Sequence, residues 1–314
     1  MNKKAIIFGG SGQDGSYMCK LLSEKNYKII SITRSLKKVS NYKKLKINSK
    51  VIKKKIDVYN KKKIEKLIFN SKCEEIYFFG GQTSPVKSYN NSYETIKSNI
   101  IPIYFILEIL KKSKKKIKFY NASSCEIFKS SKKKQDENSL KFPSNPYGLS
   151  KLISFYLIKF YRENYKLSCF SAIMFHHESI LRKKNFLIPK IISSAKKIYS
   201  KKRNKLDLGN INVVKDWGWA PEYVNLIYRL MQKKNFDDYV IGTGKSVSIR
   251  YVLNYIFKYF NLNWKNYVNI NKKYFRDIDI VQSRADISKL KKNLNWSPKF
   301  YIEDVIKKII LHKN

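Results

Sequence analysis

The stretch Lys4-Ala5-Ile6-Ile7-Phe8-Gly9-Gly10-Ser11-Gly12-Gln13-Asp14-Gly15 decides the fold of this 314-residue chain. Its apolar first part predicts a short buried strand, and its glycine-rich turn opens an amphipathic helix that runs to about Lys25. Glycines at 9, 12 and 15 let the backbone turn sharply and approach a pyrophosphate, whose charge is stabilised at a helix N-terminus. A glycine turn between a strand and a helix predicts a dinucleotide-binding unit. The candidate cofactor residues of this turn are Gly9, Gly10, Ser11, Gly12, Gln13, Asp14 and Gly15.

Apolar runs alternate with amphipathic segments through the first half of the chain. Further strands are predicted at 28–33, 75–79, 117–121 and 168–174, with another ending at 56–58. Helices are predicted at about 95–112 and 147–164. This alternation predicts an α/β fold with a doubly wound parallel (Rossmann) sheet, which binds ligands at the carboxyl ends of its strands.

The regular alternation fades after Phe175. Helices are predicted at 186–199, 247–260 and 302–311, and a short strand at 205–208. Residues 216–220 and a helix at 221–232 are expected to return to the main sheet, because 240–242 resembles another strand. We therefore expect a Rossmann domain at 1–175 with a return segment at 213–245, and a smaller α/β substrate region formed by 176–212 and 246–314.

Three further segments are candidates for holding the dinucleotide. Arg34 follows the second strand, where an enzyme that prefers NAD typically carries an acid for the ribose hydroxyls. An arginine there suits the extra phosphate of NADP, so the sequence predicts NADP. Asp57 is placed to accept a hydrogen bond from the adenine amine. Small residues in Gly80-Gly81-Gln82-Thr83 would let the cofactor lie across the sheet edge.

The stretch from Asn121 to Lys151 carries the candidate catalytic groups. Tyr147 and Lys151 are four residues apart, so on a helix they share one face. Half-ionising an ordinary phenol at pH 7 takes roughly 4 kcal/mol, which a nearby ammonium and a cationic nicotinamide ring would help to supply. Ser124 is a candidate hydrogen-bonding hydroxyl, and Glu126 a candidate acid or base. Tyr-x-x-x-Lys alone also fits a solvated helix face, so the prediction depends on the surrounding motifs.

The chain is strongly basic, with 66 Lys and Arg against 23 Asp and Glu and a formal net charge of +43. Such a charge would suit a polyanion, because Lys and Arg release counterions from phosphates. The lysines are, however, scattered over the whole chain, and Ile, Asn, Tyr and Phe are abundant too, as an A+T-rich coding sequence would favour. We therefore expect attraction to a small anionic substrate and no nucleic-acid partner.

The cysteines and the apolar runs bear on the compartment. Four cysteines at 19, 73, 125 and 169 have no Cys-x-x-Cys spacing and lie in or beside apolar segments, which favours reduced thiols over disulfides or zinc. No carboxylate stands at metal-ligand spacing to a histidine, so no metal is expected. No apolar run reaches the roughly 18 residues of a membrane span. No cleavable apolar region follows the first lysines. We expect a soluble, cytoplasmic protein without a membrane partner.

The glycine loop, the Ser/Glu pair and the Tyr-x-x-x-Lys motif, in this order, resemble the extended short-chain dehydrogenase/reductase family. Within it the chain resembles the GDP-mannose 4,6-dehydratases, over nearly its full length. The segments that carry the narrower resemblance are Gly12-Gln13-Asp14-Gly15-Ser16-Tyr17, Tyr161-Arg162-Glu163, Phe175-His176-His177-Glu178-Ser179, Leu208-Gly209-Asn210, Asp216-Trp217-Gly218, Thr243-Gly244, Tyr274-Phe275-Arg276, Asp286 and Leu294-Asn295-Trp296-Ser297-Pro298.

The resemblance assigns roles to individual residues. The catalytic positions it implies are Ser124, Glu126, Tyr147 and Lys151. The cofactor positions it implies are Gly9 to Asp14, Asp57, Val58, Phe79, Gly80, Gly81, Gln82, Thr83, Tyr147, Lys151, His177 and Arg182. The substrate positions it implies around the nucleotide and its diphosphate are Lys190, Asn210, Lys215, Arg250, Arg276 and Asp279. The basic members come from separate segments, and convergence on one diphosphate would explain their placement.

The chain also departs from the family pattern. Ser124 stands in place of Thr and keeps the hydroxyl. Cys125 stands in place of Ser, at a position that bears on proton delivery to the leaving hydroxyl of the sugar. The other departures are His176 for Asn, Ile180-Leu181-Arg182-Lys183 for Pro-Arg-Arg-Gly, Glu94 for Tyr, Lys215 for Arg and Trp219 for His.

The resemblance implies conversion of GDP-mannose to GDP-4-keto-6-deoxymannose with loss of water, by a hydro-lyase that uses NADP. It also implies a homodimer or homotetramer. The alternatives within the same family are another nucleotide-sugar 4,6-dehydratase, a 4-epimerase or a 4-keto reductase. Glu126 separates the last two from a dehydratase, because epimerisation or reduction at C4 requires no base at C5.

Overall fold

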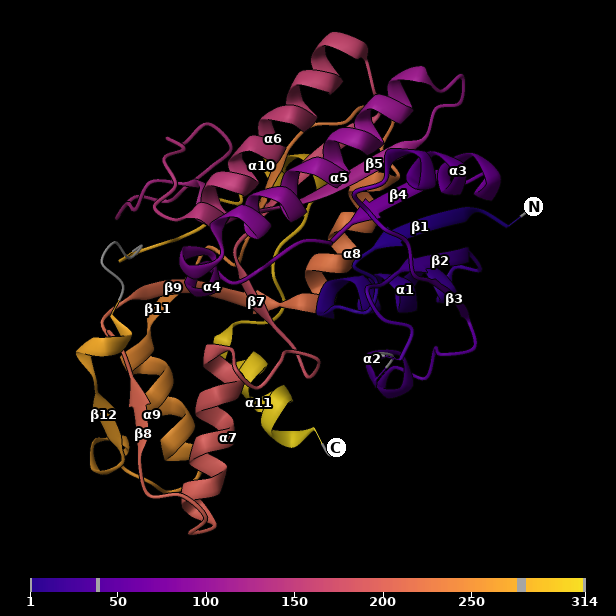
Figure 1. Cartoon of the computed structure of the whole chain (residues 1–314). Coiled ribbons are helices and arrows are strands. Elements are labelled where there is room, and N and C mark those ends of the chain that lie inside the picture. Colours follow the sequence, from indigo (N-terminus) through magenta and orange to yellow (C-terminus); the bar gives the residue numbers. More distant parts are fainter. Residues whose placement is uncertain (1, 38–39, 276–280, 313–314) are drawn as a thin grey trace. The chain divides into compact units, whose positions relative to one another are not determined.

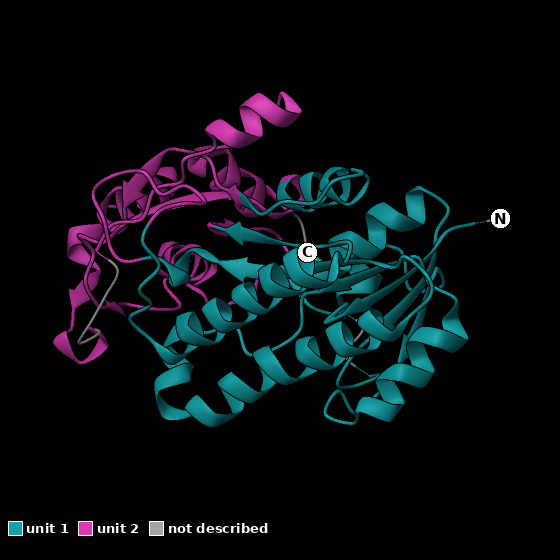
Figure 2. Ribbon diagram, turned by 90° about the horizontal axis from the view of Figure 1, so that it is seen from above, with its two compact units in different colours: residues 1–128, 140–174, 223–239 teal, residues 129–139, 175–222, 240–314 magenta. Residues whose placement is uncertain are grey.

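The computed structural model describes residues 2–37, 40–275 and 281–312, which form two compact units (Figures 1 and 2). Unit 1 comprises residues 1–128, 140–174 and 223–239. Unit 2 comprises residues 129–139, 175–222 and 240–314. Each unit is therefore assembled from three separate stretches of the chain.

The central sheet has seven strands; six lie in unit 1, and the seventh, β10, begins at Tyr239, the last residue of unit 1. Its strands, in spatial order, are β10 (Tyr239–Ile241), β6 (Cys169–Met174), β5 (Lys118–Ser124), β4 (Glu75–Phe78), β1 (Lys4–Phe8), β2 (Lys28–Ile32) and β3 (Val51–Lys54). The neighbouring pairs from β6 to β3 are all parallel. The inner strands β1, β4, β5 and β6 are buried on both faces, as a parallel sheet covered by helices requires. The predicted doubly wound parallel sheet is confirmed.

Helices cover both faces of this sheet (Figure 1). The helices of unit 1 are α1 (Gln13–Glu24), α2 (Ser40–Lys44), α3 (Lys61–Ser71), α4 (Pro85–Asn90), α5 (Ser92–Lys112), α6 (Pro146–Tyr165) and most of α8 (Ala220–Met231), with the 3₁₀ turn η1 (Cys125–Ile127). Ile6 and Phe8 of β1 pack with Leu67 of α3, Ile106 of α5 and Ile158 of α6. On the other face, the ring of Tyr228 in α8 packs edge-on against the ring of Tyr27, a residue that follows α1. The two ring centroids are 6.4 Å apart.

The late segment of unit 1 is held to the earlier strands by charged side chains. Arg162 of α6 forms a two-pronged ion pair with Asp238, with nitrogen–oxygen distances of 2.9 and 2.6 Å. Lys118 at the start of β5 donates to the Met231 carbonyl oxygen at 2.8 Å. Both pairs are partly buried, where a charge-assisted hydrogen bond contributes more than on the surface.

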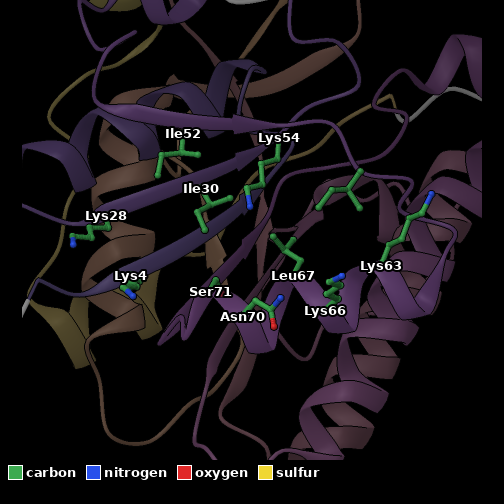
Figure 3. A pocket seen from close by; sticks show the side chains of 11 residues that line it. Lys4, Lys28, Ile30, Ile52, Lys54, Lys63, Lys66, Leu67, Asn70 and Ser71 are labelled. Carbon is green, nitrogen blue, oxygen red and sulfur yellow. The ribbon is translucent and has the colours of Figure 1, made fainter.

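A cavity of about 480 Å³ opens between α3 and strands β2 and β3 (Figure 3). Its floor includes Ile30, Ile52 and Leu67, and its rim includes Lys4 and Lys28, the first residues of β1 and β2. The lining continues to Lys54, the last residue of β3, and to Ile56, so the cavity runs along the strands. None of the residues that line it is among the predicted site residues, so the cavity is not part of the candidate site.

Unit 2 has its own apolar core. Its elements are β7 (His176–Glu178), α7 (Leu187–Tyr199), β8 (Leu206–Leu208), β9 (Val214–Trp219), β11 (Ser246–Ser248), α9 (Ile249–Tyr259), η2 (Trp264–Asn266), β12 (Val268–Ile270), η3 (Lys272–Tyr274), α10 (Ser288–Leu294) and α11 (Ile302–Leu311). Helices α7, α9 and α11 bury Ile191, Leu253 and Ile306 against the small sheet of β8 and β12. The helices predicted at 186–199, 247–260 and 302–311 are thus confirmed.

Two predicted strands differ from the structure. The third strand ends at Lys54, where its ladder with β2 stops. Its predicted end at 56–58 was wrong, because Ile56 and Val58 pack on the core from a turn in which the Asp57 carboxylate accepts the Tyr59 N–H at 3.0 Å.

Residues 216–220 do not return to the main sheet. Strand β9 pairs in parallel with β7 and antiparallel with β11, inside unit 2. The buried Asp216 carboxylate holds it there, since it accepts hydrogen bonds from Thr243, Gly244 and Ala285. Of the expected return segment 213–245, residues 223–239 lie in unit 1 and the rest in unit 2.

Two findings concern the wider character of the described chain. Among its helices, none combines the length and the apolarity needed to cross a bilayer. The four cysteines are buried and none of them forms a disulfide. In the described residues no three His, Cys, Asp or Glu side chains gather into a possible metal-binding group.

Candidate active site

The glycine turn between β1 and α1 is built where side chains would not fit. Gly9 has a φ of +74°, and a Cβ atom there would lie 2.7 Å from the Phe79 backbone. A Cβ atom on Gly15 would lie 2.5 Å from the Gly9 carbonyl oxygen. Gly12 is the N-cap of α1 and contributes no side-chain cap, so the first turn directs backbone N–H groups outward. The turn therefore has the shape and the polarity that a diphosphate requires.

Charged side chains surround Tyr59 beside the carboxyl ends of β2 and β3. Burial and the charge of Glu94 raise the pKa of Tyr59, Arg34 opposes that rise, and Asp57 adds to it. Arg34, Asp57 and Glu94 therefore each lie within electrostatic reach of Tyr59. Arg34 is exposed directly after β2, where it is able to meet a phosphate.

The segment after β4, residues 79–83, is held by helix α5. Gly81 has a φ of +97°, and a Cβ atom there would lie 2.3 Å from the Asn99 side-chain oxygen. Asn99 donates to the Gln82 carbonyl oxygen at 3.1 Å, and Ser98 accepts the Gln82 N–H at 3.2 Å. The absence of a side chain at Gly81 therefore lets the loop pack tightly onto α5.

Ser124 and Glu126 lie at the carboxyl end of β5. The Ser124 hydroxyl accepts the Glu126 N–H at 3.3 Å and so caps the turn η1. Both side chains are buried. The Glu126 carboxylate accepts a hydrogen bond at 2.8 Å from Asn145, which also caps helix α6 by accepting the Gly148 N–H. The structure thus brings Glu126 to the start of the helix that carries Tyr147.

Tyr147 and Lys151 lie on the buried face of α6, one turn apart, as predicted from their spacing. The Lys151 ammonium lies 5.8 Å from the centroid of the Tyr147 ring. It donates to the Ala122 carbonyl oxygen at 2.9 Å, which fixes it against β5. Burial lowers the pKa of Lys151 to about 8. Its charge is therefore retained at neutral pH and lost within the alkaline range.

The remaining predicted residues that the structure describes lie in unit 2. Lys215 is buried, with its Nζ 3.4 Å from His176 Nε2. Lys190 donates to the Asp207 carbonyl oxygen at 2.9 Å. Asn210 and Arg250 both hydrogen-bond to Asn212. The Asn210 side-chain oxygen accepts the Asn212 backbone N–H, and the Arg250 guanidinium donates to the Asn212 side-chain oxygen.

Two predicted cofactor residues also lie in unit 2. His177 has its Nδ1 2.8 Å from the Phe175 carbonyl oxygen. The Arg182 guanidinium lies 3.4 Å from the Glu178 carboxylate and 3.8 Å from the centre of the Phe186 ring. Arg276 and Asp279 lie outside the described residues, so their predicted role has no structural counterpart here.

Sequence reasoning missed Asn145. A signal was present, because Asn is a preferred N-cap and Pro146 occupies the first helical position. That signal predicts a cap and does not predict the contact with a glutamate 19 positions earlier in the chain.

The doubly wound sheet, the glycine turn, the Ser/Glu pair at the end of β5 and the Tyr-x-x-x-Lys motif on α6 define an extended short-chain dehydrogenase/reductase. The family model described as GDP-mannose 4,6 dehydratase matches residues 6–309. The chain belongs to the GDP-mannose 4,6-dehydratase family.

Individual relatives and folds agree with this assignment. GDP-mannose 4,6 dehydratase 1 of Arabidopsis thaliana is 32% identical, over 98% of this chain and 89% of its own. The Homo sapiens protein is 28% identical, over 98% and 90%. Among solved structures, UDP-glucose 4-epimerase of Thermotoga maritima superposes with a TM-score of 0.85 at 18% identity, covering 98% of this chain and 97% of its own. The dTDP-glucose 4,6-dehydratase of Bacillus anthracis gives 0.84 at 20%, covering 98% and 95%. At these identities the structures establish the fold.

Proposed function

We propose that the protein converts GDP-mannose to GDP-4-keto-6-deoxymannose and water. The observation that carries the proposal is the buried Glu126 carboxylate, held by Asn145 at the start of the helix that bears Tyr147 and Lys151. Membership of the GDP-mannose 4,6-dehydratase family supports the choice of substrate.

The first step is removal of the proton from the sugar 4-hydroxyl. Tyr147 accepts this proton, and the nearby Lys151 ammonium favours negative charge on the phenol oxygen. Ser124 orients the hydroxyl by hydrogen bonding. When bound, the nicotinamide ring supplies a hydride acceptor that later returns the hydride.

The second step is loss of water across C5 and C6. A ketone at C4 makes the C5 proton acidic, and Glu126 removes it. The protonated Glu126 then donates that proton to the departing 6-hydroxyl, which leaves as water. The C5–C6 double bond that remains is reduced when C6 receives the stored hydride and C5 receives a proton that has exchanged with solvent. One carboxyl group therefore acts first as a base and then as an acid. A 4-epimerase or 4-keto reductase would have no use for it.

Incubation with NADP⁺ and a panel of nucleotide sugars tests the proposed function. We expect GDP-mannose, and not its UDP, dTDP or glucose counterparts, to lose the mass of one water. In heavy water the product should carry deuterium at C5. Dehydration of a different nucleotide sugar, or a product of unchanged mass, would contradict the proposal.

We propose NADP as the cofactor. The tight glycine turn and the N-terminus of α1 fit the pyrophosphate. Arg34, exposed after β2, suits a ribose phosphate, with Asp57 nearby for the adenine. His177 and Arg182 are the further candidates from unit 2.

Arg34→Glu is expected to weaken NADP⁺ binding by roughly 10- to 100-fold, the size of one charged hydrogen bond, and NAD⁺ binding far less. Binding of each dinucleotide is measured by fluorescence titration. Lys28→Glu, the same charge change at the other end of β2, serves as the control. Equal loss of affinity in both variants would point to the general field of the protein instead of a phosphate contact at Arg34.

Turnover is expected to fall as pH rises through about 8, because burial lowers the pKa of Lys151 to about 8. Below that pH the ammonium is present and favours negative charge on Tyr147; above it the charge is lost. Lys151→Arg keeps a charge throughout this range, so its alkaline limb should move to higher pH. The profiles of kcat against pH are compared. Identical profiles would rule out titration of Lys151 as the cause.

The sugar nucleotide is proposed to bind the basic groups of unit 2, namely Lys190, Lys215 and Arg250, with Asn210. Arg276 and Asp279 are retained as candidates from the resemblance alone. The positive groups complement a diphosphate. We propose the cytoplasm as the location, because the four buried cysteines form no disulfide.

A homodimer or homotetramer is proposed from the outer surface of α6. Leu149, Ile153, Tyr156 and Phe160, spaced four, three and four residues apart, are between 37% and 51% exposed. An apolar stripe of this spacing on a helix suits packing against another helix.

A further inference from the structure

Asn145 connects the two segments that carry the candidate catalytic groups. Its Oδ1 atom accepts the Gly148 N–H at 2.8 Å, as the N-cap of α6. Its Nδ2 atom donates to Glu126 Oε2, also at 2.8 Å. Because the oxygen of the amide is occupied by an N–H donor, the amino group is the side that faces the carboxylate. The orientation of the amide is therefore set by chemistry.

The same two segments touch through their backbones. A Cβ atom at Gly148 would lie 2.3 Å from the Glu126 carbonyl oxygen, so a side chain there would push the turn and the helix apart. Pro146, at the first helical position, restricts the backbone where the helix starts. This contact sets the spacing of the segments, and the Asn145 amide extends the connection to the Glu126 carboxylate.

We propose that Asn145 is a positioning residue for proton abstraction at C5, and this inference rests on the proposed role of Glu126 as the base. A carboxylate on a flexible side chain samples several rotamers. The charge-assisted hydrogen bond from Asn145 selects one of them. Since Asn145 also begins the helix of Tyr147, it fixes the carboxylate relative to the phenol. Misplacement of a reacting group by about 1 Å costs on the order of 10²-fold in rate.

Helix capping by itself does not need the bond to Glu126. Serine is as good an N-cap as asparagine, because its oxygen also accepts a backbone N–H. It is too short to reach the carboxylate. Asn145→Ser therefore removes the connection to Glu126 and keeps the cap.

Asn145→Ser is expected to lower kcat by about 10- to 100-fold, with the KM for GDP-mannose and the melting temperature almost unchanged. The isotope effect from GDP-mannose deuterated at C5 should rise, because C5 deprotonation becomes slower than the other steps. Deuterium uptake at C5 of the added 4-keto product should slow in parallel. If the variant only loses the helix cap and the Glu126 carboxylate stays in place, the melting temperature will fall and the isotope effect will not change. That result would overturn the inference.

A second pair of variants tests the contact by stability alone. Asn145→Asp keeps the cap but sets a carboxylate against Glu126, so the melting temperature should fall by about 2–4 °C. Adding Glu126→Gln supplies an amide donor to the introduced carboxylate and should restore the melting temperature without restoring turnover. Additive effects of the two substitutions would overturn the contact, even if Asn145→Ser fails to fold.

The outcomes also separate this inference from the proposed function. Wild-type protein that places no deuterium at C5 would refute the role of Glu126. Wild-type protein that does so, with an Asn145→Ser variant equally fast, would refute the role of Asn145 alone.

Discussion

Glu126→Gln is expected to lower dehydration of GDP-mannose by about 10²- to 10⁴-fold, the usual contribution of a general base. The amide cannot remove the C5 proton, so deuterium from heavy water should no longer enter C5. Glutamine has the same length and offers an oxygen to Asn145, so the fold should persist. Turnover is followed by mass, and the C5 label by proton NMR.

A matched control for this variant is Glu222→Gln. Glu222 also accepts a hydrogen bond, from the Lys299 N–H at 2.7 Å, and takes no part in the proposed site. It should keep wild-type turnover and exchange. If the Glu126→Gln variant labels C5 at the wild-type rate, another group is the base.

Tyr147→Phe is expected to reduce turnover by a similar factor, about 10²- to 10⁴-fold, because the group that accepts the 4-hydroxyl proton is removed. The ring remains, so its buried packing on α6 is kept. Binding of NADP⁺, measured by fluorescence titration, should stay close to that of the wild type.

Tyr165→Phe removes the same hydroxyl from an exposed side chain at the end of the same helix, outside the apolar stripe, and should have no effect on turnover. A Tyr147→Phe variant that turns over within about tenfold of wild type would assign proton removal at the 4-hydroxyl to a different group.

The first half of the fold was predictable because its signals are local. The apolar run at Lys4 to Phe8 and the glycines after it require a strand, a turn and a helix whatever follows. The third strand was placed too late, since apolar residues at 56 and 58 reach the core from a turn, and periodicity does not distinguish the two. Strand β9 was predicted in the wrong sheet because the hydrogen bonds that hold it in unit 2 join Asp216 to Thr243 and Ala285, which are far away in the sequence.

The candidate site was predictable to the extent that it lies in short motifs. The four-residue spacing of Tyr147 and Lys151 and the placement of Ser124 and Glu126 after a strand can be read along the chain. The link from Asn145 to Glu126 joins side chains 19 residues apart, which no local pattern encodes. For the basic groups of unit 2, composition is uninformative, because lysine is common everywhere in this chain.

Arg162 of α6 has to wait for its ion-pair partner Asp238, which lies in the last segment of unit 1 to be translated. Unit 1 is interrupted, and residues 223–239 are translated only after much of unit 2. While the ribosome is still short of that point, β6 ends the growing sheet with an unpaired edge, a surface prone to aggregation. Nascent chains stalled before position 223 should therefore depend on chaperones, and those released beyond about 241 should not.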